Sequence, residues 1–373
     1  MHDKTEDPRG QSRQIIQQES ELVRPPVDGS PALAEIMSRS LVHIKTSKSL
    51  APRHQVGNHE LHDPDYRLVV AWAEELQLKP EEVLKKLLPS DFYLGLPTWF
   101  RSFGETETLT IITEGRFHSL FVDKERLPIS DIPLIEGLTF KELKLWNWGN
   151  TTIQINLYRF RSLEHFDCGF NGLTDLHLAG AENLKSLSCG DNKLSELDLS
   201  SAKNLRKLRC PSNMLTEINL ALNKSIVFLD LGGNPIKSID LSDVPKLTDL
   251  ECNSCEIENL DLSEASEIKR LFCGFNQLSE LNLSVVSDLK ELFCGSNQLS
   301  ELDLTSLSGL ELLNCSNNPI KELNLSLTPS LESLDCRGNP IKELDLRPLN
   351  NLKNLKYDSD RTCLVKRSDQ VFK

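Results

Sequence analysis

The sequence predicts an α/β solenoid. We expect a horseshoe-shaped stack of short coils with a parallel β-sheet on its concave face, an extended convex side with short turns, and a small, mainly helical N-terminal cap. The first observation behind this prediction is an uninterrupted period of 21 residues, which indicates stacked structural units. The period is marked by Cys168, Cys189, Cys210, Leu231, Cys252, Cys273, Cys294, Cys315 and Cys336.

The second observation is an asparagine three positions after nearly every one of these residues. It stands at Asn171, Asn192, Asn213, Asn234, Asn276, Asn297, Asn318 and Asn339, and Cys255 replaces it once. The third is the apolar pattern LxxLxCxxNxLxxLxL, followed by five linking residues. Within it, Leu271 and Cys273 alternate with their neighbours, which predicts a short strand with one buried face. One strand per unit gives a parallel sheet.

The linking residues predict the convex side. Five residues are too few for a long return helix, and no unit can bury its apolar side alone, so the units must stack. The third linking position is often apolar, which favours a tight turn held inward. It is occupied by Ala181, Ala202, Val244, Ala265, Val286, Leu307 and Leu349.

On these motifs the chain resembles the leucine-rich repeat family, in particular bacterial arrays of 21-residue units with a cysteine ladder of the internalin-J type. The resemblance covers about residues 142–360, with degenerate units near Glu142 and Leu352. It implies a solenoid that supplies a binding surface, since family members mostly do so with unrelated specificities. The polar N-terminus without a signal peptide also resembles that of bacterial effectors delivered into host cells by type III or similar systems.

The recurring cysteine could be a metal ligand, half of a disulfide, a catalytic thiol or a small core residue. Neighbouring strands about 4.8 Å apart fit poorly to the Cβ separation of about 3.8 Å in a disulfide. Zinc needs converging ligands, and the single CxxC pair, Cys252 with Cys255, has no second pair or suitably spaced histidine. The favoured interpretation is a buried thiol in a reducing compartment, with no metal and no cofactor. The asparagine amide is expected to satisfy backbone groups buried between coils.

Three domains are predicted. Residues 1–62 are polar and lack periodicity, and we expect a disordered segment that could carry a secretion signal. In it, His54, His59 and His62 suit a solvated loop better than a metal site. Residues 63–141 form the cap, with two helices, a third short helix through residues 91–103 and one or two strands within residues 107–122. Residues 142–373 form the array of about 10–11 units.

Composition narrows the partners. The formal net charge of -13 would repel phosphate backbones and anionic lipid, so we expect neither nucleic acid nor membrane partners. No apolar run reaches the length of a membrane helix, and the N-terminus lacks the apolar segment of a secretory signal. A DNA-binding role for the cap helices is disfavoured for the same electrostatic reason. Basic and apolar protein surfaces are better partners.

The outward strand positions predict the surface on which function depends. In each predicted strand, the residues just before and just after the central leucine point outward, and equivalent residues of successive strands form two columns. The column before the leucine begins with Lys144, His165 and Ser186, and the column after it begins with Trp146, Asp167 and Ser188. Aromatic and charged side chains gather in the middle of both columns, which is the composition of a protein-binding hot spot. The predicted site is Phe228, Asp230, Asp249, Glu251, Arg270, Phe272, Phe275, Glu291, Phe293 and Leu312. The alternative is that these side chains only pack on one another or on the N-terminal segment.

We therefore expect a protein–protein interaction module whose concave face binds a partner, folded in the cytoplasm and secreted as a bacterial effector or virulence factor. No phosphate loop, nucleophile elbow or HExxH motif is present, so an enzyme is not expected. Two alternatives are open. Residues 63–140 could form an enzyme or enzyme regulator with the repeats as substrate receptor, or the chain could be an intracellular scaffold.

Overall fold

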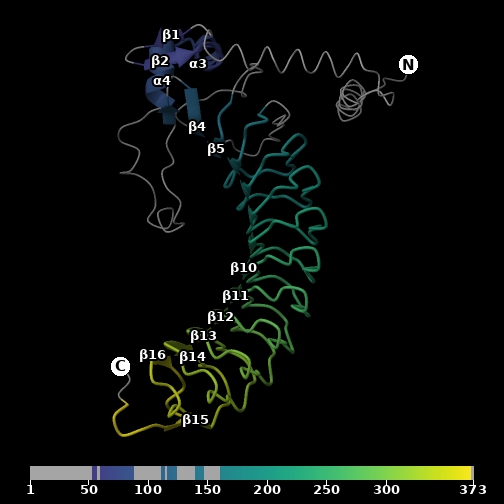
Figure 1. Cartoon of the computed structure of the whole chain (residues 1–373), viewed down its shortest axis with the longest axis vertical. Coiled ribbons are helices and arrows are strands. Elements are labelled where there is room, and N and C mark those ends of the chain that lie inside the picture. The colour runs from purple at the N-terminus through teal and green to yellow at the C-terminus, as the bar shows by residue number, and fades with distance from the viewer. Residues whose placement is uncertain are drawn as a thin grey trace, which may run out of the picture. The chain divides into compact units, whose positions relative to one another are not determined.

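The computed structural model describes residues 53–56, 59–87, 111–113, 116–123, 139–146 and 160–370 (Figure 1). The chain divides into residues 1–52 and a second unit, residues 53–373, to which all described elements belong. The disorder expected up to residue 52 and the third cap helix expected through residues 91–103 lie outside the described residues.

The two predicted cap helices are α3 (Asp63–Leu76) and α4 (Pro80–Leu87). Pro64 lies in the first turn of α3, where its missing N–H has no intrahelical partner to lose. The helix ends where Gln77 adopts a left-handed conformation with φ 54°. α4 begins at a proline and carries acidic residues in its first turn and basic residues in its last, which complements the helix dipole. The buried apolar side chains of the pair are Leu68, Val69, Trp72, Ala73, Val83, Leu84 and Leu87.

The cap contains more strand than the sequence predicted. An antiparallel hairpin of β1 (Arg53–Val56) and β2 (His59–His62) contacts α3, where disorder was expected up to residue 62. His54 stacks on Tyr66 with ring centroids 4.1 Å apart, so the interpretation as a solvated histidine loop is wrong for this residue. The hairpin was missed because few of its residues are apolar. Its buried apolar residues are Val56 and Leu61.

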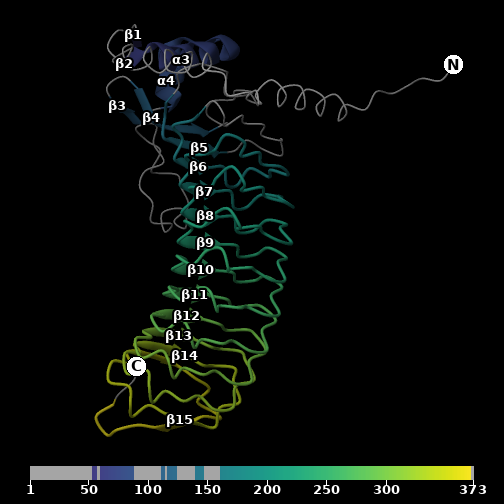
Figure 2. The ribbon, with the colours of Figure 1, turned by 45° about the vertical axis from the view of Figure 1, so that its right-hand side comes forward.

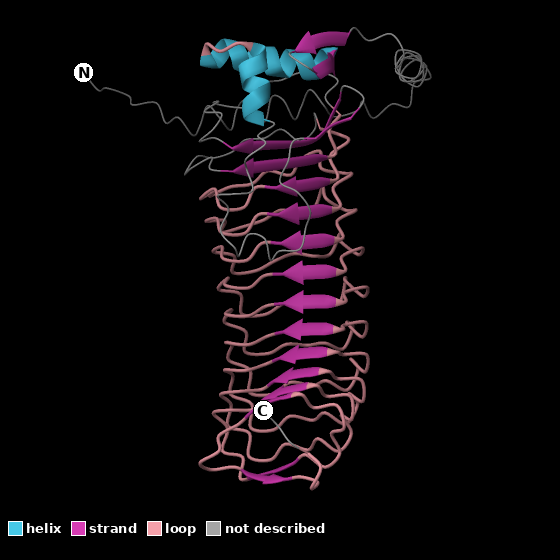
Figure 3. Ribbon diagram, turned by 90° about the vertical axis from the view of Figure 1, so that its left-hand side faces the viewer, coloured by secondary structure: helices cyan, strands magenta, loops and turns pink. Residues whose placement is uncertain are grey.

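A sheet of 13 strands runs through the array (Figures 2 and 3). Its strands pair in parallel from β4 to β16, and β3 pairs with β4 in the antiparallel sense at one edge. The cap therefore supplies β3 and β4 directly to the solenoid sheet. The strands are β3 (Ile111–Thr113), β4 (Arg116–Asp123), β5 (Glu142–Trp146), β6 (His165–Asp167), β7 (Ser186–Ser188), β8 (Lys207–Arg209), β9 (Phe228–Asp230), β10 (Asp249–Glu251), β11 (Arg270–Phe272), β12 (Glu291–Phe293), β13 (Leu312–Asn314), β14 (Ser333–Asp335) and β16 (Asn354–Lys356).

Within the main sheet, the pairing register follows the 21-residue period from β6 to β16 and departs from it between β5 and β6. Glu142 pairs with His165 and Lys144 with Asp167, so the predicted alignment of Lys144 and Trp146 is wrong by two residues. A shift of two keeps every side chain on its predicted face, because strand periodicity is two. For that reason the alternation of apolar and polar residues around Leu143 is equally compatible with either register.

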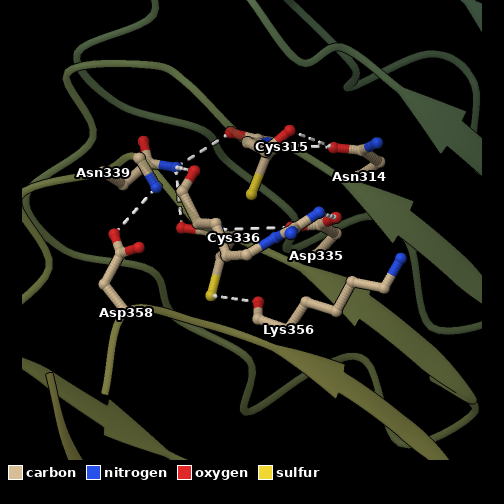
Figure 4. A network of polar contacts seen from close by, with 10 residues as sticks. Asn314, Cys315, Asp335, Cys336, Asn339, Lys356 and Asp358 are labelled. Carbon is tan, nitrogen blue, oxygen red and sulfur yellow. Dashed lines mark hydrogen bonds and ion pairs between the residues drawn. The ribbon is translucent and has the colours of Figure 1, made fainter. Parts of the chain in front are cut away.

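The asparagines join successive coils as predicted. In the rung of Figure 4, the Asn339 amide nitrogen donates to the carbonyl oxygens of Cys315, one coil back, and Cys336, in its own coil, both at 3.0 Å. The Asn339 carbonyl oxygen accepts from the Ile320 backbone N–H at 3.1 Å. One buried side chain thus satisfies three backbone groups that water cannot reach.

Cys255 forms the one weakened rung. Its thiol lies 3.5 Å from the Leu231 carbonyl oxygen, which is a poor substitute for an amide because sulfur is a weak donor and acceptor. The Ile236 N–H, whose counterparts in other coils bind an asparagine oxygen, turns instead to the carbonyl of Asn234 at 2.8 Å.

The ladder cysteines are buried and unpaired, as the sequence predicted. Each has its side chain in the core, and none of the described thiols forms a disulfide. Burial raises the pKa of the Cys273 and Cys294 thiols well above the usual value. A thiol held in its neutral form packs as a small apolar residue.

Short turns, with no helix, connect the strands within residues 160–370, which confirms the predicted convex side. In one coil the Ala265 N–H bonds the Leu262 carbonyl and the Ile268 N–H bonds the Ala265 carbonyl, so two turns follow each other around a buried alanine. A second parallel pair, β15 (Glu343–Asp345) with β17 (Cys363–Val365), forms outside the main sheet in the last described coils.

Candidate protein-binding face

The predicted site residues come from five neighbouring strands, β9 to β13, and from the turn after β11. The strands pair in register, so residues of one column follow one another about 4.8 Å apart. The structure therefore brings the predicted residues into one continuous region of the surface that bears the first and third strand positions, called here the sheet face. Whether a partner binds there stays a prediction.

Phe272 and Phe293, called here the ring pair, form the apolar centre of the region. Their ring centroids are 4.5 Å apart with 8° between ring planes, and both side chains are half-buried. Neither ring contacts a third ring among the described residues. The stacked pair forms a small, partly exposed apolar patch bordered by charge, and aromatic side chains are enriched in protein interfaces.

Phe275 lies in the turn after β11, three residues beyond Phe272, and is 67% exposed. Its φ of 56° is left-handed, a conformation that disfavours bulky residues. The equivalent turn residue in most other coils is serine, aspartate, asparagine or glycine, which suit this conformation. Those residues are Asp191, Ser212, Gly233, Ser254, Ser296, Asn317 and Gly338, whereas one other coil also has a phenylalanine there, Phe170, with φ 59° and 39% exposure.

Phe228 does not belong to the exposed apolar surface, contrary to the prediction. It is only 7% exposed, and the Arg209 guanidinium lies 4.7 Å from its ring centroid. A long arginine on the neighbouring strand can cover a ring diagonally across the sheet, and the cation attracts the ring face. The predicted site thus omitted Arg209, which covers one of its rings. Its position next to Asp230 in the same column could have indicated that it belongs to this region.

Arg270 is paired rather than free. Its guanidinium forms an ion pair with Asp249 on the neighbouring strand, and the Thr248 hydroxyl donates to the same carboxylate. The Asp249 side chain is 17% exposed and that of Arg270 is 45% exposed. This pair therefore adds little net charge to the sheet face.

Asp230 and Glu251, called here the carboxylate pair, occupy the same column on β9 and β10 and pair in register. Burial and the neighbouring Glu251 raise the pKa of Asp230 to about 6, although the Gly232 N–H donates to Asp230 at 3.1 Å. Burial also raises the pKa of Glu251, against the opposing effect of Arg209 and Arg270. Like charges placed opposite each other destabilise a sheet, so the pair carries a cost to folding.

Glu291 and Leu312 extend the region toward the C-terminal coils. Both are half-buried, and they pair in register on β12 and β13. Leu312 adds apolar surface near the ring pair, and Glu291 adds a further carboxylate between Arg270 and Leu312. All the predicted residues except Phe228 thus remain at least partly accessible.

Two features of the described residues concern metal binding and thiol reactivity. Within those residues, no group of three or more histidine, cysteine, aspartate or glutamate side chains is placed to hold a metal ion. The Cys168 thiol is buried, and burial raises its pKa well above the usual value, which disfavours a nucleophilic thiolate. None of the described helices has the length and apolar character of a membrane span.

Comparison with known proteins identifies solved structures only. No family model and no curated protein matches the sequence. The functional domain of InlJ from Listeria monocytogenes, which includes a cysteine ladder, is 28% identical with a TM-score of 0.53, over 56% of this chain and 52% of that domain. The chain therefore spans about half the length of that structure.

Two further structures share the fold. YopM from Yersinia enterocolitica WA-314 is 25% identical with a TM-score of 0.50, covering 63% of this chain and 53% of its own. The Leptospira interrogans protein LIC12759 is 22% identical with a TM-score of 0.51, covering 60% of this chain and 67% of its own.

Proposed function

The chain is a leucine-rich repeat protein with units of about 21 residues and a buried cysteine ladder, and we propose that it is a protein-binding module whose partner docks on strands β9 to β13. Leucine-rich repeat folds generally bind proteins, and proteins built on such scaffolds are generally not enzymes. The ring pair, half-buried and bordered by carboxylates, is the observation that carries the proposal.

The side chains on the face have the distribution of a binding hot spot. Hot spots place aromatic residues at the centre of a contact and surround them with residues that exclude water. Here Phe272 and Phe293 form the centre, and the exposed Phe275 follows in the turn after β11. Asp249, Arg270 and Glu291 lie in the neighbouring column. A solvated sheet surface would not need a stacked pair of phenylalanines.

The charges on the face indicate the kind of partner. The carboxylate pair has no side-chain ion pair within the described residues, and the formal net charge of the chain is -13. A partner that brings both apolar and basic side chains would cover the ring pair and relieve the repulsion between Asp230 and Glu251. The proposed partner is therefore a protein with a basic and apolar surface.

Affinity capture from host-cell lysate tests the proposal. Wild-type protein, the double variant Phe272→Ala with Phe293→Ala, and the control Ser188→Ala, on the same face but on β7, serve as bait. Truncation of a hot spot costs about 2 kcal/mol or more, so the double variant should lose the partner that wild type and control recover. Equal recovery of one partner by all three baits would remove this face as the site.

We further propose that the protein acts after export, as an effector. The support is the fold similarity to proteins of Listeria, Leptospira and Yersinia and the polar character of residues 1–60. Residues 1–60 fused to a reporter enzyme should carry it out of a bacterium with a type III secretion system and not out of a strain lacking that system. Retention of the reporter in both strains would contradict export by this route.

A further inference from the structure

The carboxylate pair and the ring pair lie in one straight column of the sheet face, in the order Asp230, Glu251, Phe272, Phe293. We infer that this column binds a polyproline II segment of the partner, in which a basic residue lies three positions from a proline or another apolar residue. The inference rests on the proposed function and deepens it, because it names the conformation and the spacing that the face recognises.

The spacing follows from the register. The midpoint of the carboxylate pair and the midpoint of the ring pair are two strand steps apart, about 9.6 Å. A polyproline II helix has three residues per turn and a rise of about 3.1 Å, so residues i and i+3 point the same way about 9.3 Å apart. An extended β-strand gives about 6.8 or 13.6 Å between residues on one face. Two turns of an α-helix give about 10.8 Å, a poorer match.

The carboxylate end of the column is suited to a cation. Glu251 makes no side-chain hydrogen bond or ion pair with the described residues, and Asp230 accepts only from the Gly232 N–H. Arg209 and Arg270 lower the pKa of Glu251 by their charge, but neither forms an ion pair with the two carboxylates, since Arg209 lies over Phe228 and Arg270 binds Asp249. An arginine or lysine side chain between the two carboxylates would form charge-assisted hydrogen bonds that the chain itself does not supply.

The aromatic end of the column is suited to an apolar side chain. Recognition of polyproline II segments uses aromatic surfaces, because the preformed helix loses little entropy on binding. The parallel planes of Phe272 and Phe293, 8° apart, stand in line with the carboxylates, and Phe275 with its 67% exposed side chain lies at the edge of the same strand. A proline ring can pack on these rings without ordering further rotamers.

A peptide library displayed on phage and selected on the full-length chain tests the inference. The expected consensus is arginine or lysine three positions from proline, leucine or an aromatic residue, in either order. In fluorescence anisotropy, a synthetic twelve-residue peptide with this spacing should bind at least tenfold more tightly than peptides with spacings of two or four. Phe272→Ala and Glu251→Gln should each weaken its binding at least tenfold, and Ser188→Ala should leave it unchanged.

Reversing the charge at position 251 distinguishes a lost contact from a misfolded variant. Glu251→Lys should bind the basic peptide at least tenfold more weakly, and it should recover affinity for a peptide in which glutamate replaces the basic residue. Selected peptides that need Phe272 but show no basic residue, or a helical spacing of seven, would overturn the inference and leave the proposed function standing. Selected peptides whose binding is unchanged by Phe272→Ala, or no selected peptides, would contradict both.

Discussion

Phe275 is a residue whose conformation is unfavourable for stability and whose side chain is available for binding. Phe275 is exposed, and its backbone is left-handed like that of Phe170, whereas serine, aspartate, asparagine or glycine has this conformation in the other coils. Backbone strain maintained at an exposed position indicates a use for the side chain. The sequence could place Phe275 at the strand edge through the 21-residue period, but only the backbone angle reveals this strain.

Phe275→Asn should therefore raise the free energy of unfolding while weakening partner binding. Asparagine tolerates the left-handed region, and Asn317 occupies it at the same register, so we expect a gain of about 1 kcal/mol. Urea unfolding measures the gain, and Ser296→Asn is the matched control with a smaller effect. A loss of stability in Phe275→Asn would show that the phenyl ring supports the fold.

Phe228 and Arg209 show why surface exposure is hard to predict from columns alone. The column correctly placed Phe228 on the sheet face, but the exposure of its ring depends on which rotamer the neighbouring arginine adopts. The stem of an arginine can cover apolar surface while its charged end stays in water. Likewise, the repeat places Arg270 next to Asp249, but only the side-chain positions show that the two form an ion pair.

At the scale of the coil, the asparagine rung is the element most fully predicted. Its period, burial and role in satisfying backbone groups all followed from the spacing, because a 21-residue repeat superposes equivalent atoms in every coil. The first coil was less predictable. The Asn171 amide reaches the Leu145 carbonyl, 26 residues back instead of 24, because two extra residues separate β5 from β6.

Asn297→Ala should destabilise the array strongly. The substitution removes the donor for the Cys273 and Cys294 carbonyls and the acceptor for the Leu278 N–H, all buried. Unsatisfied buried groups cost about 1–3 kcal/mol each and do not add fully, so we expect a loss of about 3 kcal/mol. Chemical denaturation of Asn297→Ala beside the exposed neighbour Gln298→Ala measures it. Equal stability of the two variants would contradict the role of the rung.

The carboxylate pair on β9 and β10 predicts a pH dependence of stability. The folded pKa of Asp230, about 6, lies above its ordinary value of 3.8, so the folded chain favours the protonated form. The resulting stabilisation is complete below pH 4 and is lost as the pH rises through about 6. The shift corresponds to at most about 3 kcal/mol, which partial solvent exposure reduces to about 1 kcal/mol.

Asp230→Asn should remove this dependence. Relative to wild type, we expect the variant to be more stable by about 1 kcal/mol at pH 7.5, with the gain vanishing toward pH 4. Thermal unfolding at several pH values, with Asp175→Asn as an exposed control, measures the difference. A variant that is less stable than wild type at pH 7.5 would show that the Asp230 carboxylate is compensated within the fold.

At the scale of the whole molecule, the repeat predicts the scaffold far better than the binding site. The solenoid follows from a pattern that every coil repeats, so many residues report the same geometry. The site depends on outward residues that change from coil to coil and do not follow the repeat. The column of Asp230, Glu251, Phe272 and Phe293 follows from the 21-residue period, whereas the stacking of the two rings and the raised pKa of Asp230 depend on side-chain positions.

The central claim is that the partner contacts the sheet face at β9 to β13, and site-specific photo-crosslinking tests it most directly. A photoreactive phenylalanine analogue replaces either Phe275, in the turn after β11, or Leu222, which is 50% exposed in the turns between strands. Irradiation of each with the captured partner should give a crosslinked product at position 275 and none at position 222. A product at position 222 without one at position 275 would contradict the account.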